Sequence, residues 1–249
     1  MKVKSQPDTV LLISDLHLEP ARPDLTRAFF HFLETTAADA GALYILGDFF
    51  NVWIGDDDDT PLCGAVSRAL RQLADSGTAV YLMHGNRDFL IGEKWATASG
   101  ATLIPEPCLL QQDDAQFLLM HGDSLCTLDT DYMAIRRMFR DPQWQREFLA
   151  RPLAERRAFA EHARARSKTM SSNKADDIMD VTPTEVERVL ADNGVSRLIH
   201  GHTHRPAVHA MNLGGRPATR IVLGDWGTEG WYLRIAGGKA ELRNFPIAN

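Results

Sequence analysis

Short apolar runs alternate with helix-like segments along the first half of the chain. Four runs are typical of buried strands, at 10–13, 42–46, 80–83 and 117–120. Between them, residues 25–36 and 62–74 carry apolar side chains at helical spacing, and the second segment stops before Asp75-Ser-Gly77. Strands that alternate with helices predict an α/β architecture.

The pattern changes after residue 120. Residues 125–193 are typical of helix almost throughout and contain no convincing strand. Strand-like runs return at 197–199, 218–223, 230–235 and 240–243. We therefore expect a discontinuous core, residues 1–124 and 194–249, interrupted by a helical cap or lid insertion over residues 125–193.

Residues of metal-ligand type come shortly after five of these runs. They are Asp15 and His17, then Asp48, Asn86 and His121, and finally His202 with His204, most of them beside a glycine. In open α/β sheets, sites form beyond the carboxyl ends of strands. A neighbouring glycine lets backbone approach an ion closely. The order and placement predict one composite metal site.

The kinds of donor atom narrow the choice of metal. Carboxylate, amide and imidazole donors without thiolates favour Mn²⁺, Fe²⁺ or Zn²⁺ over Cu(I) or iron–sulfur clusters, and Mn²⁺ is our first choice. We expect two ions, with Asp48 as the carboxylate that bridges them. Asp15, His17, Asp48 and His204 would hold one ion, and Asp48, Asn86, His121 and His202 the other. Two adjacent ions can activate water and stabilise an in-line displacement at phosphorus, which predicts phosphoester or phosphoanhydride hydrolysis.

Composition limits the class of protein. The 249 residues carry a net charge of −6, which argues against a general nucleic-acid binder. The three scattered cysteines, Cys63, Cys108 and Cys126, do not form a disulfide framework. The polar start lacks a signal peptide, and no apolar run is long enough to span a bilayer. We expect a cytoplasmic protein, at most peripheral to a membrane, without a nucleic-acid or protein partner.

The helical segment is locally basic although the chain is acidic. Residues 131–168 combine aromatic and aliphatic side chains with nine arginines. This combination favours contact with a lipid or an anionic substrate. The alternative is a small helical cap with its apolar stripe in its own core and its arginines in water. The polar stretch at 167–174 has hydroxyls and a lysine that suit a phosphate and a sugar, although an ordinary loop and helix cap would have the same composition.

Four longer motifs carry a resemblance to a known family. They are Ser14-Asp-Leu-His-Leu18, the segment from Gly47 to Asp58, the segment from Gly85 to Gly92, and the segment from His200 to Pro206. With them the chain resembles the calcineurin-like metallophosphoesterase superfamily over nearly its whole length, and within it the UDP-2,3-diacylglucosamine hydrolases of lipid A biosynthesis. The resemblance implies a β-sandwich flanked by helices, with a helical cap insertion.

The same resemblance implies an activity and its setting. Water would attack the α-phosphorus of UDP-2,3-diacylglucosamine and release UMP and 2,3-diacylglucosamine 1-phosphate (lipid X). Two Mn²⁺ ions would be bound per chain. The enzyme would associate peripherally with the cytoplasmic side of the inner membrane and hold the acyl chains beneath the cap.

Residue roles carry over position by position. Asn86, Arg87 and His121 would be catalytic. The substrate-contact positions would be Asn86, Arg87, Asp129, Ser167, Ser171, Lys174 and His202; some relatives have asparagine where this chain has Ser171. Arg87 stands where the wider superfamily commonly has a histidine. Arginine does not release its proton readily, but it can clamp a phosphate through two hydrogen bonds.

Other polar residues near the motifs are expected to have structural roles. Asp123 would orient His121, since metal-bound imidazoles usually donate to such a partner. The acidic run 56–59 would be a solvated loop, unless it helps to position the cap. Five further histidines are expected outside the site: His31, His84, His162, His200 and His209.

Two other functions remain open from the sequence. One is a dinuclear-metal phosphodiesterase or phosphatase with a soluble substrate, against which the apolar, arginine-rich insertion argues. The other is a non-catalytic scaffold with the same fold. Scaffolds typically lose ligands, whereas all seven ligand candidates are present here.

Overall fold

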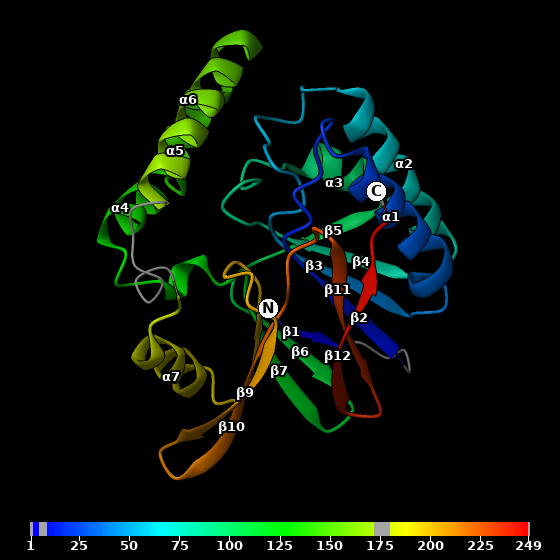
Figure 1. Cartoon of the computed structure of the whole chain (residues 1–249), viewed down its shortest axis with the longest axis vertical. Helices are drawn as coiled ribbons and strands as arrows, with labels where there is room; N and C mark the ends of the chain where they lie inside the picture. The colour runs from blue at the N-terminus through cyan, green and yellow to red at the C-terminus, as the bar shows by residue number, and fades with distance from the viewer. Residues whose placement is uncertain (1, 5–8, 172–179, 249) are drawn as a thin grey trace.

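Two six-stranded sheets form the centre of the molecule (Figure 1). The computed structural model describes residues 2–4, 9–171 and 180–248. Sheet A contains β1 (Lys2–Lys4), β6 (Cys108–Gln112), β7 (Ala115–Leu119), β8 (Arg197–His200), β10 (Arg216–Val222) and β9 (Ala207–Leu213), in that spatial order. Sheet B contains β12 (Lys239–Pro246), β11 (Glu229–Ala236), β2 (Thr9–Ile13), β3 (Ala42–Leu46), β4 (Ala79–Met83) and β5 (Ala101–Ile104).

The side-chain alternation of the strands explains the layers. Successive side chains of a strand point to opposite faces. On β2, Val10 and Leu12 belong to the cluster between the two sheets, whereas Leu11 and Ile13 belong to the cluster on the outer face of sheet B. Strands β2 to β5 pair in parallel and their residues are mostly buried, as expected of a sheet covered on both faces.

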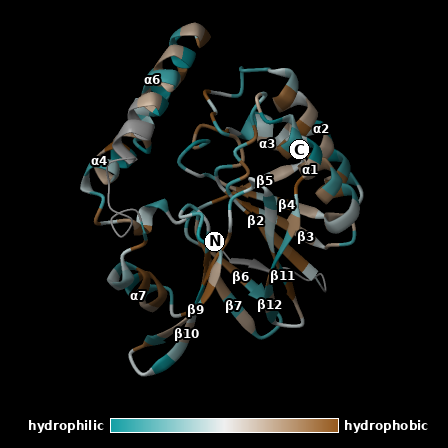
Figure 2. Cartoon of the chain, viewed as in Figure 1, coloured by the Kyte–Doolittle hydropathy of each residue, from teal (hydrophilic) through white to brown (hydrophobic). Residues whose placement is uncertain are grey.

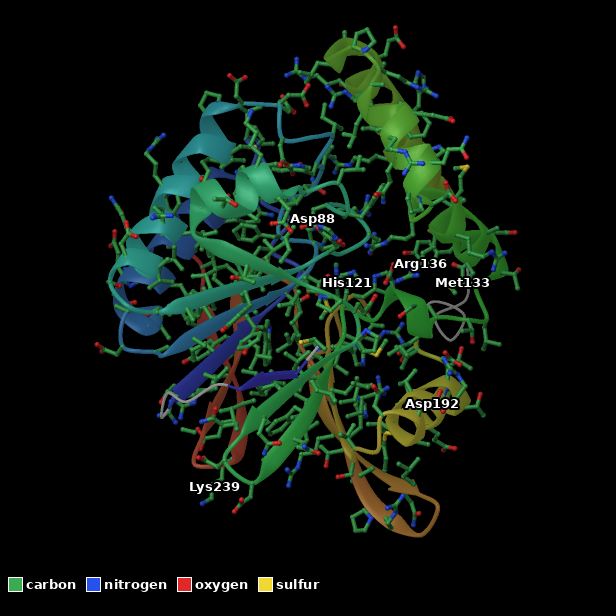
Figure 3. The ribbon with its side chains drawn as sticks, turned by 180° about the vertical axis from the view of Figure 1, so that it is seen from behind. Asp88, His121, Met133, Arg136, Asp192 and Lys239 are labelled. Carbon is green, nitrogen blue, oxygen red and sulfur yellow. The ribbon has the colours of Figure 1, made fainter. Side chains whose placement is uncertain are left out.

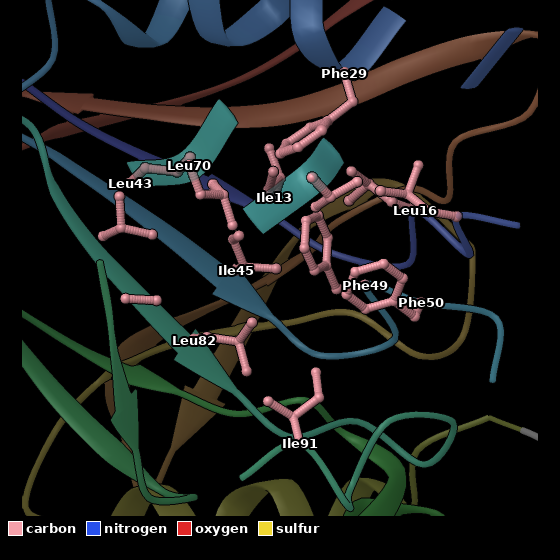
Figure 4. Packing of buried hydrophobic residues seen from close by; sticks show 14 of the residues in the cluster. Ile13, Leu16, Phe29, Leu43, Ile45, Phe49, Phe50, Leu70, Leu82 and Ile91 are labelled. Carbon is pink, nitrogen blue, oxygen red and sulfur yellow. The ribbon is translucent and has the colours of Figure 1, made fainter. Parts of the chain in front are cut away.

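Helices cover the outer face of each sheet. On sheet B these are α1 (Pro23–Phe32), the π-helical turn η1 (Leu33–Ala37), α2 (Pro61–Asp75) and α3 (Glu93–Ser99). Figure 4 shows this packing, in which Phe29 of α1 and Leu70 of α2 lie over Ile13 and Ile45. On sheet A the cover is α7 (Pro183–Asp192), whose Val186 packs with residues of β7 and β8.

The chain between β7 and α7 is helical where it is described. It forms η2 (Asp123–Leu125), α4 (Thr130–Phe139), α5 (Pro142–Leu149) and α6 (Leu153–Ser171). Helices α4 to α6 stand beside the sandwich in Figure 1, and the hydropathy colours of α6 in Figure 2 alternate along its length. No helix in the described part is long and apolar enough to cross a bilayer. The expected boundaries of the cap insertion, residues 125 and 193, stay a prediction. Within this range α7 packs against sheet A, whereas the described residues of α4 to α6 do not.

Acidic residues before α2 hold the helical segment against the core. Nη1 and Nη2 of Arg156 on α6 both donate to the carboxylate of Asp57, and Nη1 also donates to Ile54 O at 2.6 Å. Arg157 pairs with Asp58 at 2.6 Å. Asp56 accepts hydrogen bonds from the backbone N–H groups of Gly92 and Trp95. The expectation of a solvated loop was therefore wrong for these three acids. Asp57 and Asp58 contact α6, as the alternative of positioning the cap predicts, whereas Asp56 binds backbone within the core.

Candidate metal centre and substrate pocket

Loops at the carboxyl ends of five strands bring the predicted ligands together. Asp15 and His17 follow β2, Asp48 follows β3 and Asn86 follows β4, all in sheet B, whereas His121 follows β7 and His202 and His204 follow β8, in sheet A. The two sheets therefore contribute opposite sides of one site. Backbone hydrogen bonds join the loops: Asp15 N donates to Gly47 O at 3.1 Å, and Gly201 N donates to His121 O at 2.9 Å.

The donor atoms lie within coordination reach of one another. Nε2 of His17 is 3.3 Å from Nε2 of His204, which is itself 3.3 Å from Oδ1 of Asp15. Nε2 of His121 is 3.7 Å from Oδ1 of Asp48 and 3.0 Å from Oδ1 of Asn86. Asp48 also reaches the first group, with Oδ2 at 4.0 Å from Nε2 of His17. Asp48 thus lies between the two groups.

His202 completes the second group through its ring. The imidazoles of His202 and His121 pack edge to face with centroids 5.1 Å apart, and His202 N donates to Oδ2 of Asp15 at 2.9 Å. All seven predicted ligands therefore lie in one cluster. Their division between two ions stays a prediction.

Backbone strain is concentrated at the same positions. Six described non-glycine residues have a positive φ, and five of them are ligand candidates: Asp15 at 58°, His17 at 48°, Asp48 at 49°, His202 at 66° and His204 at 55°. A side chain in the left-handed region costs about 1–3 kcal/mol, and such residues cluster at functional sites. This strain is an indication of a site that is independent of the residue types.

Two glycines allow the loops to come this close. A Cβ on Gly85 would lie 2.2 Å from both N and Oδ1 of Asp48. A Cβ on Gly201 would lie 2.2 Å from Oδ2 of Asp15. Any larger residue would push apart the segments that carry the ligands, so both positions require glycine for close approach rather than for backbone conformation.

The buried carboxylates and imidazoles shift one another's pKa values. Burial, which is countered only in part by the charge of His121, raises the pKa of Asp48 to about 7. Burial lowers the pKa of His121, but the charges of Asp48, Asp15, Asp123 and Glu106 outweigh it and raise that pKa to about 9. Burial lowers the pKa of His17 to about 3 and that of His202 to about 4. These two imidazoles are neutral near pH 7, the form that binds a metal.

The donor set fits divalent cations. Oδ1 of Asp15 and Nδ1 of His17 are buried and make no hydrogen bond with any described residue. Two buried carboxylates and four imidazoles converge, and no arginine or lysine of the described residues forms an ion pair with either carboxylate. Buried polar atoms normally have partners, and a metal ion would supply the missing ones.

A backbone carbonyl orients His121. Nδ1 of His121 lies 2.9 Å from Leu46 O, so an Nδ1–H donor leaves Nε2 free to bind an ion. The expectation that Asp123 orients His121 was wrong. Oδ2 of Asp123 accepts instead from the Tyr132 hydroxyl at 2.6 Å and from Nε of Arg136 at 2.8 Å. His200, expected below the site, is fully buried, and its Nδ1 contacts Gly201 O at 2.8 Å.

An amphipathic pocket of about 390 Å³ opens from the metal centre toward the helical segment. Asn86, Arg87 and Asp123 line its polar end. Its other walls are mainly apolar and come from the core and from α4 to α6, including Trp53, Phe89, Leu90, Ile135, Met138, Phe139, Trp144, Phe148 and Phe159. A ligand that fits such a pocket has a charged group at one end and a hydrocarbon part at the other.

The predicted substrate residues are placed in different ways. Arg87 lies in the pocket wall, and its buried Nε makes no hydrogen bond with a described residue. Asp129 also lines the pocket, and its carboxylate caps α4 by accepting from Tyr132 N at 3.0 Å. Ser167 and Ser171 lie on α6, but their side chains, like Lys174 as a whole, are outside the described residues.

Several pocket residues were not predicted from the sequence. Tyr132, Arg136 and Arg140 line the pocket from α4, and Asn51 and Trp53 line it from the loop after Asp48. The three α4 residues are spaced by four, a periodicity that predicts a common helix face. Besides the basic and aromatic composition of residues 131–168, that spacing was the only signal for them in the sequence.

Comparison with known proteins agrees with this geometry. Residues 9–206 match the sequence model of the Metallophos family, described as calcineurin-like phosphoesterase, and the chain belongs to this family. Within it, the chain belongs with the UDP-2,3-diacylglucosamine hydrolases. A protein of that name from Cellvibrio japonicus (strain Ueda107) is 56% identical over 95% of this chain and 99% of its own length. Another, from Chromohalobacter salexigens, is 55% identical over 96% of this chain and 98% of its own. The expected fold class and family are thereby confirmed.

Proposed function

We propose that this protein hydrolyses UDP-2,3-diacylglucosamine to UMP and 2,3-diacylglucosamine 1-phosphate, by attack of water on the α-phosphorus, in lipid A biosynthesis. The observation that carries the proposal is the pocket, whose polar end meets the candidate metal centre and whose apolar walls come from α4 to α6. A diacylated sugar linked to a pyrophosphate has the same polarity. The names of the relatives support the same substrate.

The proposal includes two divalent ions, with Mn²⁺ as the first choice. Asp15, His17 and His204 would hold one, Asn86, His121 and His202 the other, and Asp48 both. When bound, such a pair supplies an activated water and neutralises charge that develops at phosphorus. The chain's own residues do the rest.

Arg87 is the proposed clamp for the phosphate. Its backbone N–H donates to Oδ1 of Asp48 at 2.8 Å, which fixes its main chain beside the metal centre, and its guanidinium lies in the pocket wall with a free Nε donor. A guanidinium binds two phosphate oxygens at once and keeps its charge. Because the departing group is itself a phosphate, which is a stable anion, charge neutralisation is needed more than proton donation.

The first test is release of UMP from detergent-solubilised UDP-2,3-diacylglucosamine, with Mn²⁺ and then with chelator. Metal-dependent release is expected in the wild type and in an Arg146→Ala control, since Arg146 is exposed on α5. His17→Ala should abolish it, and Arg87→Ala should lower kcat about 10²- to 10³-fold. If no UMP is released but the protein cleaves a soluble aryl phosphodiester in a metal-dependent way, the result would instead favour a phosphodiesterase with a soluble substrate.

We also propose that the pocket mouth lies against the cytoplasmic face of the inner membrane. Leu128, Ile135, Met138 and Leu149 are exposed apolar residues on or beside α4 and α5, and two of them also line the pocket. Flotation with vesicles of anionic phospholipid tests this. Leu128→Ser should reduce binding, whereas Val208→Ser should not, because Val208 is equally exposed, at 58%, but lies on β9. Equal binding by both variants would contradict the proposal.

A further inference from the structure

One face of α4 is directed at the metal centre. Tyr132, Arg136 and Arg140 are spaced by four residues, and all three are partly buried, whereas their neighbour Arg137 is exposed. Residues four apart lie on the same side of a helix. Each of the three contacts a different loop that carries a candidate ligand.

Arg136 acts on the loop that carries His121. Its Nη2 donates to Oε2 of Glu106 at 3.0 Å. The other oxygen of Glu106 accepts from His121 N at 2.8 Å and from Gly122 N at 3.1 Å. Figure 3 shows Arg136 reaching from α4 toward His121. The guanidinium therefore fixes the carboxylate that in turn holds the main chain of a ligand.

The other two residues act on the loops of Asn86 and His202. Nη2 of Arg140 donates to Gly85 O at 2.9 Å, one residue before Asn86, and its guanidinium lies over the ring of Phe89. The Tyr132 ring stacks on His202 with centroids 6.0 Å apart. The Tyr132 hydroxyl and Nε of Arg136 share Oδ2 of Asp123, which ties the two side chains together.

The other group of ligands is held without α4. Asp15 N donates to Gly47 O, and His17 N donates to Asp48 O at 2.9 Å, both within the core. Among the described residues, no hydrogen bond, ion pair or ring contact joins α4 to Asp15, His17 or His204. Of the described loops that carry candidate ligands, the three side chains thus contact those of Asn86, His121 and His202.

We propose that Tyr132, Arg136 and Arg140 are positioning residues for the ion held by Asn86, His121 and His202, so that docking of α4 and binding of that one ion favour each other. The inference rests on the two-ion function proposed above. It adds that the two ions differ in their dependence on the cap. Linkage requires the effect to be reciprocal: loading this ion strengthens docking of α4 as much as docking strengthens binding.

Titration of the metal-free protein with Mn²⁺, followed by electron paramagnetic resonance of free and bound ion, tests the proposal without an activity assay. Wild type and the Arg137→Met control should bind two ions. In Arg136→Met, one ion should bind about 10- to 100-fold more weakly, the usual effect of losing a group that orients a ligand. Arg140→Met should weaken binding of the same ion. It removes bonds to carbonyl groups and a contact with the Phe89 ring but no ion pair, so it keeps the test open if Arg136→Met fails to fold.

Two backgrounds identify which ion is affected. In His17→Ala, which keeps the Asn86, His121 and His202 set, adding Arg140→Met should weaken the remaining ion. In Asn86→Ala, which keeps the other set, the same addition should leave the remaining affinity unchanged.

Three outcomes would overturn the inference: equal effects of Arg140→Met in both backgrounds, no effect in either, or the same loss of affinity in Arg137→Met. If the wild type still binds two ions, these outcomes leave the proposed function intact. A wild type that binds only one ion would overturn the two-ion proposal itself.

Discussion

At the residue scale, the candidate metal centre depends on conformations that most residues avoid. Five ligand candidates hold positive φ angles, and two glycines leave room for the loops to touch. Each left-handed residue costs free energy that the surrounding hydrogen bonds must offset. The site is therefore built on a backbone that tolerates little added volume.

Gly85→Ala tests this tolerance. The new Cβ would overlap the backbone nitrogen of Asp48, so we expect a loss of about 1–3 kcal/mol in unfolding free energy and of metal-dependent activity. Thermal unfolding and the UMP assay measure both.

Gly64→Ala is the matched control for that substitution. Gly64 lies within α2, where the nearest atom to an added Cβ is Nη1 of Arg68 at 3.4 Å. Alanine should stabilise this helix by up to about 1 kcal/mol. If the Gly85 variant kept full stability and activity, the close approach would not be essential.

At the scale of elements, both apolar packing and charges attach the helical segment to the core. Five of its nine arginines contact acidic side chains or carbonyl groups of the core: Arg136, Arg140, Arg156, Arg157 and Arg164. For these five, the local positive charge that favoured a lipid or anionic ligand serves to dock helices. Arg137 and Arg146 remain exposed and available to anions.

The pair between Arg156 and Asp57 should make stability depend on pH. The hydrogen bond from Arg156 lowers the pKa of Asp57 below its ordinary value near 3.9. The pair therefore stabilises the folded state above that ordinary pKa, and the stabilisation is lost as the pH falls through the lowered pKa. Asp57→Asn should lower the unfolding free energy by about 1 kcal/mol at pH 6, and the difference should narrow as the pH falls below about 4.

Asp59→Asn is the control for this measurement. It removes the same charge from the same acidic run, and Asp59 is exposed. Thermal unfolding of the three proteins between pH 3 and pH 7 makes the comparison. A pH-independent gap, or an equal effect of Asp59→Asn, would show that the pair does not fasten the helices.

At the scale of the whole molecule, the metal centre lies where both sheets end. The ligands come from loops after β2, β3, β4, β7 and β8, so bound ions would join the two halves of the sandwich. Ions that bind only the folded state stabilise it by mass action.

Removal of the ions should therefore lower the melting temperature. With free Mn²⁺ at a hundredfold excess over its dissociation constant, each ion adds about 2.7 kcal/mol, so the loss on chelation should be roughly 5–10 °C per ion. The melting temperature of Asp48→Asn should fall much less on chelation, because Asp48 belongs to both groups of candidate ligands. His209→Ala should respond like the wild type, since His209 lies on β9. Equal melting curves with and without chelator would contradict ion binding at this site.

The local pattern of apolar and polar residues was sufficient to predict much of this protein's structure. Strand-like runs followed by Asp15, Asp48 or His121 predicted the α/β layers and the cluster of ligands, because side-chain periodicity sets which face a strand buries and parallel strands end at a common edge. Four strands were not predicted: β1, β5, β6 and β9. Strands β1 and β5 have only three and four residues, β6 ends in two glutamines, and β9 is partly exposed on both faces, so none has a clear apolar pattern.

Only the tertiary structure decided which polar groups meet across long sequence distances. Asp57 pairs with Arg156, Glu106 with Arg136, and Asp123 binds Tyr132 rather than His121. No periodicity encodes such pairs, because each joins residues that docking of a whole helix brings together. The sequence alone determined the fold class and predicted which candidate metal ligands come together, since both follow from local order along strands. The attachment of the cap, and its unequal hold on the two groups of ligands, came from packing between elements.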